Sequence, residues 1–165
     1  MNIFVVHKHP EVSARMLCDK HVSKMILETA QMLSTVAVSL GYEDPCLYKP
    51  VHAKHPCTLW AGASYHNWKW LCMHGLAMAD EFEYRYKNRH KSSEVIEVIF
   101  DNQMAPTNKQ WHKWHTRCTP FAQAMPEQYK HKDAVTAYRN YYLGEKKRFA
   151  KWTKRTPPNW WLENA

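Results

Sequence analysis

The 165-residue sequence predicts an all-α fold, a single-domain compact helical bundle with long loops. Two long segments carry apolar residues at the three- and four-residue spacing of a helix that buries one face. Between them, residues 42–56 hold three prolines and read as a loop, while residues 2–7 look extended. With 45% hydrophobic residues, the chain is long enough for one domain, 1–165, with its own core.

The first long helix is expected from about Glu11 to about Leu40. Pro10 disfavours helical backbone at His9, and Gly41 is well placed to end the helix. Because a helix turns by about 100° per residue, one side of this segment is apolar and would face the core. That side is formed by Val22, Ile26, Ala30, Leu33 and Ala37.

A second long helix is expected from about Thr58 to about Lys87. Gly62 and Gly75 lie inside it, where each glycine costs about 1 kcal/mol relative to alanine. We therefore expect these glycines to mark places where helices approach closely. The apolar residues at helical spacing are Leu59, Ala63, Trp70, Leu71, Ala77, Met78 and Phe82.

The remaining chain predicts two more helices and one long loop. The stretch SSEVIEVIF is typical of a short helix with Ser92 or Ser93 as its N-cap. A proline-containing loop is expected over residues 101–126. The last helix is expected over about residues 132–151, before the sequence RTPPNWW.

The charge balance favours polyanionic partners. Lys and Arg outnumber Asp and Glu by 23 to 15, which gives a formal net charge of +8 at pH 7. Nucleic acid is the first expected partner and an anionic membrane the second, while solubility alone is the simpler alternative. The sequence has no run of 18 apolar residues and no basic start followed by an apolar stretch, so we expect neither a membrane span nor a signal peptide.

Cysteine and histidine usage predicts no metal and no cofactor. The five cysteines are an odd number without a CxxC pair, so reduced thiols in a cytosolic setting are expected. Two groups have spacings that a metal could use, His52 with His55, and His112 and His115 with Cys118. Neither belongs to a complete ligand set of recognisable form, and contacts to phosphate explain these histidines as well.

Basic and aromatic residues are interleaved near the C-terminus. Arg and Lys can neutralise phosphates, while Tyr and Trp offer flat faces to bases or sugars. The alternative is a helix with an aromatic core side and a basic outer side. We favour the core for Tyr138, Tyr142 and Phe149, and leave both interpretations open for Trp160 and Trp161.

One face of the first helix carries polar residues at positions i, i+3 and i+7, namely His21, Lys24 and Glu28. A solvated face is the simpler interpretation and the one that the pattern alone favours. If the face instead lines a cleft, Glu28 is a candidate general base whose charge is tuned by Lys24 and His21.

The chain contains no GxSxG, P-loop, GxGxxG or HExxH motif, so the usual nucleophile signatures are missing. An α-amine is an alternative nucleophile, because its reference pKa near 7.7–8.0 leaves it appreciably neutral at physiological pH. A neutral amine can form a Schiff base with a sugar carbon. Because Asn2 is large, we expect Met1 to be retained and to carry this amine.

These features resemble those of the pyrimidine-dimer DNA glycosylase/AP lyase family of the phage endonuclease V type. That family has Asp-x-His on its first helix and a catalytic acid nine positions after the Asp, and Asp19, His21 and Glu28 stand at this spacing. The opening MNIFVVHKHP, residues 55–82 and the basic aromatic tail 132–161 resemble the corresponding parts of the family. The chain also resembles uncharacterised phage proteins that share CDKHV-KM-LE-AQ-LS and AYRNYY-GEK-RFAKWTKR.

The resemblance implies a DNA base-excision enzyme, a DNA N-glycosylase with AP lyase activity on damaged or modified pyrimidines. Its catalytic residues would be Met1, which forms the Schiff base, Glu28, and His21. It implies double-stranded DNA as partner, a monomer, and the cytoplasm of the host cell if the protein is phage-encoded. The DNA-binding residues would be Lys24, Arg15, Lys20, His52, Lys54, His55, Arg139, Lys151, Lys154, Arg155, Trp160 and Trp161.

Two alternatives remain open at this point. Leu27 and Gln31 stand where the family has arginines near its catalytic Glu, which leaves open the base that is recognised. A phage enzyme that modifies a base in the same pocket without breaking the glycosidic bond is one alternative. A non-enzymatic nucleic-acid-binding protein is the other.

Overall fold

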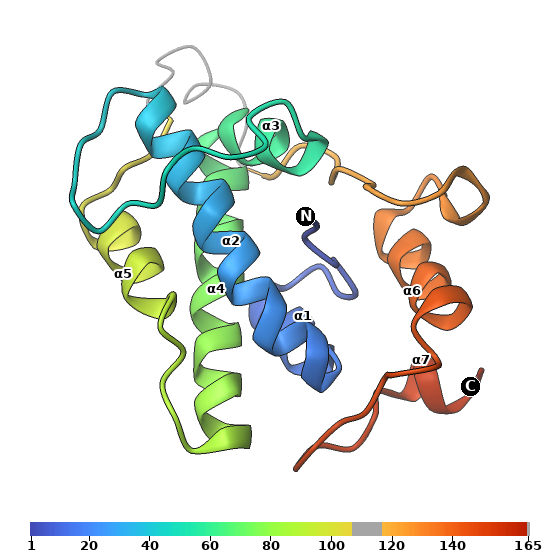
Figure 1. Cartoon of the computed structure of the whole chain (residues 1–165). Coiled ribbons are helices and arrows are strands. Elements are labelled where there is room, and N and C mark those ends of the chain that lie inside the picture. Colours follow the sequence, from blue (N-terminus) through green and yellow to red (C-terminus); the bar gives the residue numbers. More distant parts are fainter. Residues whose placement is uncertain (107–116, 165) are drawn as a thin grey trace.

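The computed structural model describes residues 1–106 and 117–164 (Figure 1). The described residues form helices and no strand, so the predicted all-α class is confirmed. Their buried apolar residues form one core that extends from Ile3 to Trp161. The elements are α1 (Pro10–Met16), α2 (Asp19–Ser39), α3 (Pro56–Gly62), α4 (Tyr65–Tyr86), α5 (Ser93–Asp101), a 3-10 turn η1 (Glu127–Tyr129), α6 (Ala134–Glu145) and α7 (Asn159–Leu162).

The first predicted helix is two helices, which corrects the expectation of one continuous helix. The chain leaves α1 at Leu17, whose backbone is extended, and α2 begins after Cys18. Both residues of the break are fully buried, and the Cys18 N–H donates to the Tyr142 hydroxyl at 3.3 Å. The break is therefore stabilised by a contact with a residue far along the chain, which local sequence does not reveal.

The second predicted helix is also two helices, α3 and α4. Ser64 interrupts it in an extended conformation, and its side chain accepts a hydrogen bond from the Asn67 N–H at 3.1 Å. Ser64 is thus an N-cap that begins a new helix. At the start of α5, Ser92 takes the N-cap position, although its side chain makes no capping hydrogen bond.

The helices α2, α4 and α5 pack closely where a glycine permits it. A Cβ atom on Gly75 would lie 2.8 Å from both Ile96 and Thr29 side-chain carbons, which are on α5 and α2. The expected close approach is confirmed here. At Gly62 the nearest side-chain atom, on Val36, would lie at an ordinary 3.4 Å.

The N-terminal segment is not paired in a sheet, but it is buried. Residues 3–6 lie in the core, between the helical bundle and α6 (Figure 1). The Asn2 amide donates to the Ala124 carbonyl at 2.7 Å, and Arg139 donates to the Val6 carbonyl at 3.0 Å. These bonds anchor the segment at both ends and so fix where the first residue lies.

The last long helix, α6, is shorter than expected. Asp133 caps α6 by accepting a hydrogen bond from the Thr136 N–H, and α6 ends at Glu145 rather than near residue 151. The chain then passes along α2, where the Asp19 N–H donates to the Lys151 carbonyl at 2.8 Å. Among the described residues, no helix is long and apolar enough to cross a membrane.

Candidate active site

The helix α2 brings Glu28 next to the first residue of the chain. The α-amine of Met1 lies 3.6 Å from Oε2 of Glu28, and Glu28 is buried, with 7% of its surface exposed. The other carboxylate oxygen, Oε1, lies 3.2 Å from Nζ of Lys24, whose side chain is exposed. The solvated-face interpretation is therefore wrong for Glu28 and His21, which are both buried, and holds for Lys24.

The Glu28 carboxylate is incompletely bonded. Oε2 is buried and has no hydrogen-bond partner among the described residues, because the amine at 3.6 Å is too distant for a normal hydrogen bond. Buried carboxylate oxygens are normally satisfied. A carboxylate held between two amines can stabilise a developing cation and can accept a proton from a group that enters between them.

The surroundings hold the Met1 residue in place. The Thr58 hydroxyl contacts the Met1 sulfur at 3.5 Å. His55 caps α3 by accepting from the Cys57 N–H at 3.1 Å. Burial lowers the pKa of His55, and the nearby Met1 amine lowers it further, whereas Glu28 raises it. His55, expected to bind phosphate, is thus electrostatically coupled to the amine and carboxylate.

The His21 side chain is bonded to Tyr142 and not to the Glu28 carboxylate. Its Nδ1 is hydrogen-bonded to the Tyr142 hydroxyl, and its ring stacks on Phe4 with centroids 4.1 Å apart. Burial, together with the smaller effects of the charges of Lys146, Lys24 and Lys20, lowers the pKa of His21 to about 3. The imidazole is therefore neutral at pH 7, and its contacts make it a positioning residue for the N-terminal segment; a catalytic role for it remains a prediction.

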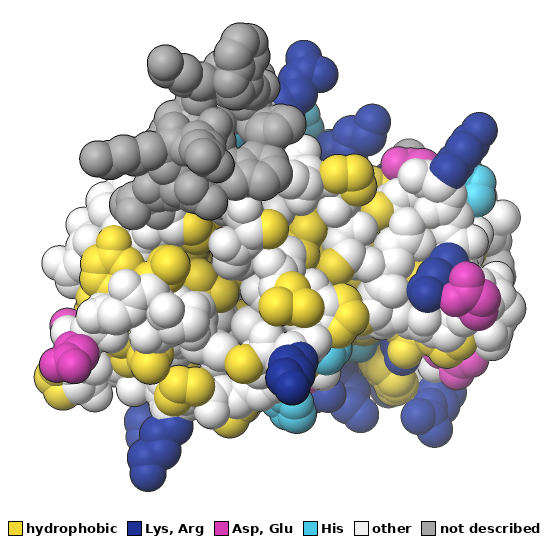
Figure 2. Space-filling view, turned by 90° about the horizontal axis from the view of Figure 1, so that it is seen from above, with side chains coloured by type: hydrophobic (Ala, Val, Ile, Leu, Met, Phe, Trp, Pro, Cys, Tyr) yellow, Lys and Arg dark blue, Asp and Glu magenta, His cyan; other side chains and the backbone are white. Residues whose placement is uncertain are grey.

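The predicted DNA-binding residues fall into exposed and packed groups. Lys and Arg side chains project from several sides of the face shown in Figure 2, with apolar patches between them. Exposed cations at several points along the chain fit the expected contacts to phosphates. The exposed members of the predicted set are Arg15, Lys20, Lys24, His52, Lys54, Lys151 and Lys154.

Other members of the set are engaged inside the protein. Arg139 is half-buried, bonds to the Val6 carbonyl, and lies over the Trp160 ring at 5.6 Å. Trp161 is 8% exposed and packs against Trp152, with ring centroids 4.9 Å apart. This packing gives Trp161 a structural role, and DNA contact by either tryptophan remains a prediction.

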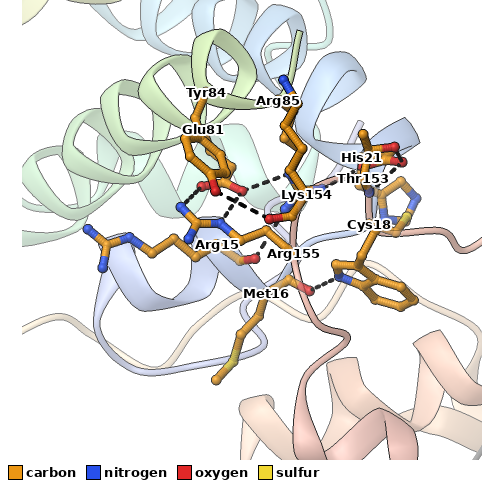
Figure 3. A network of polar contacts seen from close by, with 12 residues as sticks. Arg15, Met16, Cys18, His21, Glu81, Tyr84, Arg85, Thr153, Lys154 and Arg155 are labelled. Carbon is orange, nitrogen blue, oxygen red and sulfur yellow. Dashed lines mark hydrogen bonds and ion pairs between the residues drawn. The ribbon is translucent and has the colours of Figure 1, made fainter.

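Arg155 belongs to a network of ion pairs that Figure 3 shows. Glu81, which is buried, accepts from Arg155 through both carboxylate oxygens at 2.8 and 2.9 Å and from Arg85 at 2.7 Å. Arg85 also donates to Asp19 at 2.8 Å, and Asp19 accepts from the Thr153 N–H and hydroxyl. The network thus holds the C-terminal segment against α2 and α4. The hydrogen bond between Arg155 and Glu81 raises the pKa of Arg155.

Sequence analysis missed Glu81 and Arg85. They stand at i and i+4 inside a predicted helix, a spacing that normally indicates an exposed pair, and nothing local reveals that both are buried. Asp19, the first residue of the Asp-x-His motif, belongs to this network rather than to the amine–carboxylate pair.

The described cysteines and histidines form no metal centre. All five cysteines are free, and within residues 1–106 and 117–164 there is no group of three or more His, Cys, Asp or Glu side chains that could hold a metal ion. His112 and His115 lie outside the described residues.

A comparison with known families identifies the chain. The family model for pyrimidine dimer DNA glycosylase matches residues 1–94, which span α1 to α4 and include both Met1 and Glu28. No curated protein and no solved structure matches the chain. Since the match covers more than half of the sequence, the chain belongs to the pyrimidine dimer DNA glycosylase family.

Proposed function

We propose that this DNA glycosylase removes a damaged or modified pyrimidine through a Schiff base on the Met1 amine and then cleaves the strand as an AP lyase. The observation that carries the proposal is the 3.6 Å separation of the Met1 amine from the buried Glu28 carboxylate. Met1 and Glu28 stand at the two ends of a 28-residue stretch. Because Glu28 is 7% exposed, its carboxylate is not a mobile surface group that lies near the amine by chance.

The first half of the reaction replaces the base with the amine. The nucleotide is extruded from the duplex so that its sugar can enter the site. The neutral amine attacks C1′, the C1′–N bond to the base breaks, and the base leaves with that electron pair and a proton. The C1′–O4′ bond then breaks, O4′ takes a proton from the amine nitrogen, and the opened sugar carries an imine between Met1 and C1′. Glu28 stabilises the positive charge that develops on the sugar.

The second half of the reaction cleaves the strand. Glu28 removes a proton from C2′, the C3′–O bond breaks, and the phosphate leaves with the electron pair. Water then hydrolyses the imine, which releases the unsaturated sugar and regenerates the amine. Because one carboxylate serves both halves, its incompletely bonded oxygen is an advantage.

Met1 is a better candidate nucleophile than Lys24, the other amine beside Glu28. An α-amine has a reference pKa roughly 2.5 units lower than that of a lysine, so far more of it is neutral at pH 7. The Lys24 side chain is 60% exposed, which suits a contact to a DNA phosphate. We propose that the exposed cations bind duplex DNA and that the protein acts as a monomer.

Borohydride trapping tests the proposal. The protein is incubated with duplex DNA that contains one abasic site, reduced with sodium borohydride, and the cross-linked peptide is identified by mass spectrometry. We expect the adduct on Met1, in the wild type and in Lys24→Met alike. An adduct on Lys24, or trapping that survives acetylation of the α-amine, would remove Met1 from the mechanism.

One observation favours a second candidate function. Leu27, where the family has an arginine, is 41% exposed beside Glu28, so the damage-binding charge of the family is replaced by an apolar side chain. An enzyme that modifies a base in the same pocket would not need to break the glycosidic bond. Such an enzyme would release no free base from DNA and would give no borohydride adduct.

A further inference from the structure

A pocket of about 620 Å³ is lined by residues that include neither Met1 nor Glu28. Its volume is within the roughly 300–1,000 Å³ of ligand pockets in proteins. Its walls come from residues 8–9, from Trp70 on α4, from residues 117–123 and from the start of α6. Much of this wall lies outside the part of the chain that the family model matches.

The pocket has an apolar aromatic wall. Trp70 and Phe121 lie with ring centroids 5.0 Å apart at 66°. The Trp70 indole N–H donates to the Lys8 carbonyl at 2.8 Å, and Trp60 packs against both rings. The rings are therefore held in fixed positions. Trp70 is 6% exposed, so a flat aromatic ligand would pack against the half-buried Phe121 ring and the exposed edge of Trp70.

The charged groups around this wall are mostly cations. Lys8, Arg117 and Lys132 line the pocket, and none of them forms an ion pair with another described residue. The acid in the lining, Asp133, already accepts hydrogen bonds from the N–H and hydroxyl of Thr136. Besides these hydrogen bonds, the charge of Lys8 helps to lower the pKa of Asp133, so the two side chains already interact. Cations in excess of acids beside an aromatic wall complement a ligand that carries both a phosphate and a flat ring.

A second hollow of about 550 Å³ adjoins the pocket and extends the positive surface. It shares Phe121, Gln123 and Lys132 with the first, and adds Lys130 and His131. Gln123 fixes this edge, because its amide both donates to the His131 carbonyl and accepts from the His131 N–H. Lys130 forms an ion pair with Glu127 at 2.7 Å, so a phosphate that extends from the aromatic wall would meet Lys132 along this edge.

We infer that this pocket binds one nucleotide, with the base against Phe121 and the exposed edge of Trp70 and the phosphate at Lys8 and Lys132. The nucleotide comes either from an unpaired position in DNA or from a free mononucleotide. Lys8 stands seven positions after Met1, so the two sites are at most about 25 Å apart and one DNA molecule can occupy both. The inference does not depend on the Met1 chemistry, because the pocket needs only binding.

Protection of Cys118 from alkylation tests the inference. Cys118 lines the pocket and is half-buried, while Cys46 is also partly exposed and does not line it. Peptide mapping after timed iodoacetamide treatment measures both rates in one sample. We expect thymidine monophosphate to slow Cys118 at least about fivefold, more than thymidine or inorganic phosphate alone, and to leave Cys46 unchanged.

DNA probes separate the two sources of the nucleotide. A short duplex with one unpaired nucleotide is compared with the fully paired duplex and with thymidine monophosphate. Stronger protection by the unpaired duplex identifies DNA as the ligand, and protection by the mononucleotide alone identifies the free nucleotide. If no nucleotide or DNA protects Cys118, the inference is overturned, whether or not abasic DNA is trapped on Met1.

Charge and aromatic variants check that protection arises in the pocket. Lys8→Glu combined with Lys132→Glu should weaken nucleotide binding at least about tenfold, because two charge-assisted contacts are lost. The matched control, Lys49→Glu with Lys91→Glu, changes two exposed lysines outside the pocket and should leave nucleotide binding unchanged. Phe121→Leu provides an independent variant if the double charge change unfolds the protein. Protection that persists in both pocket variants contradicts the inference.

Discussion

Two groups of charged residues both include side chains of α2 but differ in how completely they are bonded. In the network of α2, α4 and the C-terminal segment, both oxygens of Glu81 accept hydrogen bonds of 2.7–2.9 Å. Nine residues along α2 from Asp19, a member of that network, Glu28 has one buried oxygen without a hydrogen bond and an amine at 3.6 Å.

We propose that the difference separates a structural role, for Glu81, from a chemical one, for Glu28. A fully bonded buried ion group holds segments in one arrangement, and removing one partner leaves an uncompensated charge. An unsatisfied buried carboxylate oxygen costs about 1–3 kcal/mol, which a protein retains where the group has another use. The two regions therefore predict opposite responses to the same substitution, Glu to Gln.

Glu28→Gln should cause the largest effect, and it should affect activity rather than folding. The amide keeps the size of the side chain but cannot accept a proton or stabilise a cation as a carboxylate does. We expect the single-turnover rate of base release to fall about 10²–10⁴-fold. The rate is measured on damaged duplex DNA with excess enzyme, and the thermal midpoint should stay close to that of the wild type.

A matched control is Glu83→Gln on α4, because Glu83 is exposed and makes no ion pair with a described residue. Its rate and stability should both match the wild type. Equal loss of activity in the two variants would show that the rate responds to net charge and not to the carboxylate beside Met1.

Glu81→Gln should reverse this pattern. The Arg85 side chain is fully buried and Arg155 shares the same carboxylate, so removal of the negative charge leaves excess positive charge inside the protein. We expect the free energy of unfolding to fall by about 3 kcal/mol. Urea denaturation measures it, and base release at low temperature should stay within a few-fold of wild type. A stable but inactive variant would instead assign Glu81 to the chemistry.

The same comparison explains which parts of the molecule the sequence reveals. The positions of Glu28 and Lys24 were predictable, because the spacing i, i+4 on a helix is a local property. The proximity of Met1 to Glu28 came from a family resemblance, not from the spacing. Neither helix spacing nor charge indicated that Glu81 is buried, because its partner Arg155 is 74 residues away.

The helix breaks were unpredictable for the same reason. Leu17 and Cys18 form the break between α1 and α2, where the Cys18 N–H donates to the hydroxyl of Tyr142, 124 residues away. Ser64, by contrast, is a good N-cap residue, and its spacing to Asn67 is a local signal that could have divided the second predicted helix. Local capping is readable in a sequence, whereas a tertiary hydrogen bond is not.

His21, which lies on α2 between Asp19 and Glu28, gives the smallest predicted effect and links the two regions. Burial and three lysine charges lower its pKa from 6.5 to about 3. Between these pH values the unfolded chain binds a proton that the folded protein does not, so stability falls as the pH falls. Above pH 6.5 the imidazole is neutral in both states and contributes no pH dependence.

His21→Phe should therefore flatten the pH dependence of stability. The ring still packs against Phe4, and the Tyr142 hydroxyl keeps its contact with the Cys18 sulfur at 3.6 Å. Between pH 6.5 and 5 the slope of the unfolding free energy should decrease by up to about 1.4 kcal/mol per pH unit, as measured by urea denaturation at each pH. His74, with a pKa lowered to about 4 by burial, retains its own share of the slope in both proteins. Parallel slopes for variant and wild type would mean that His21 is protonated in the folded state, and that it can then supply positive charge beside Glu28 after all.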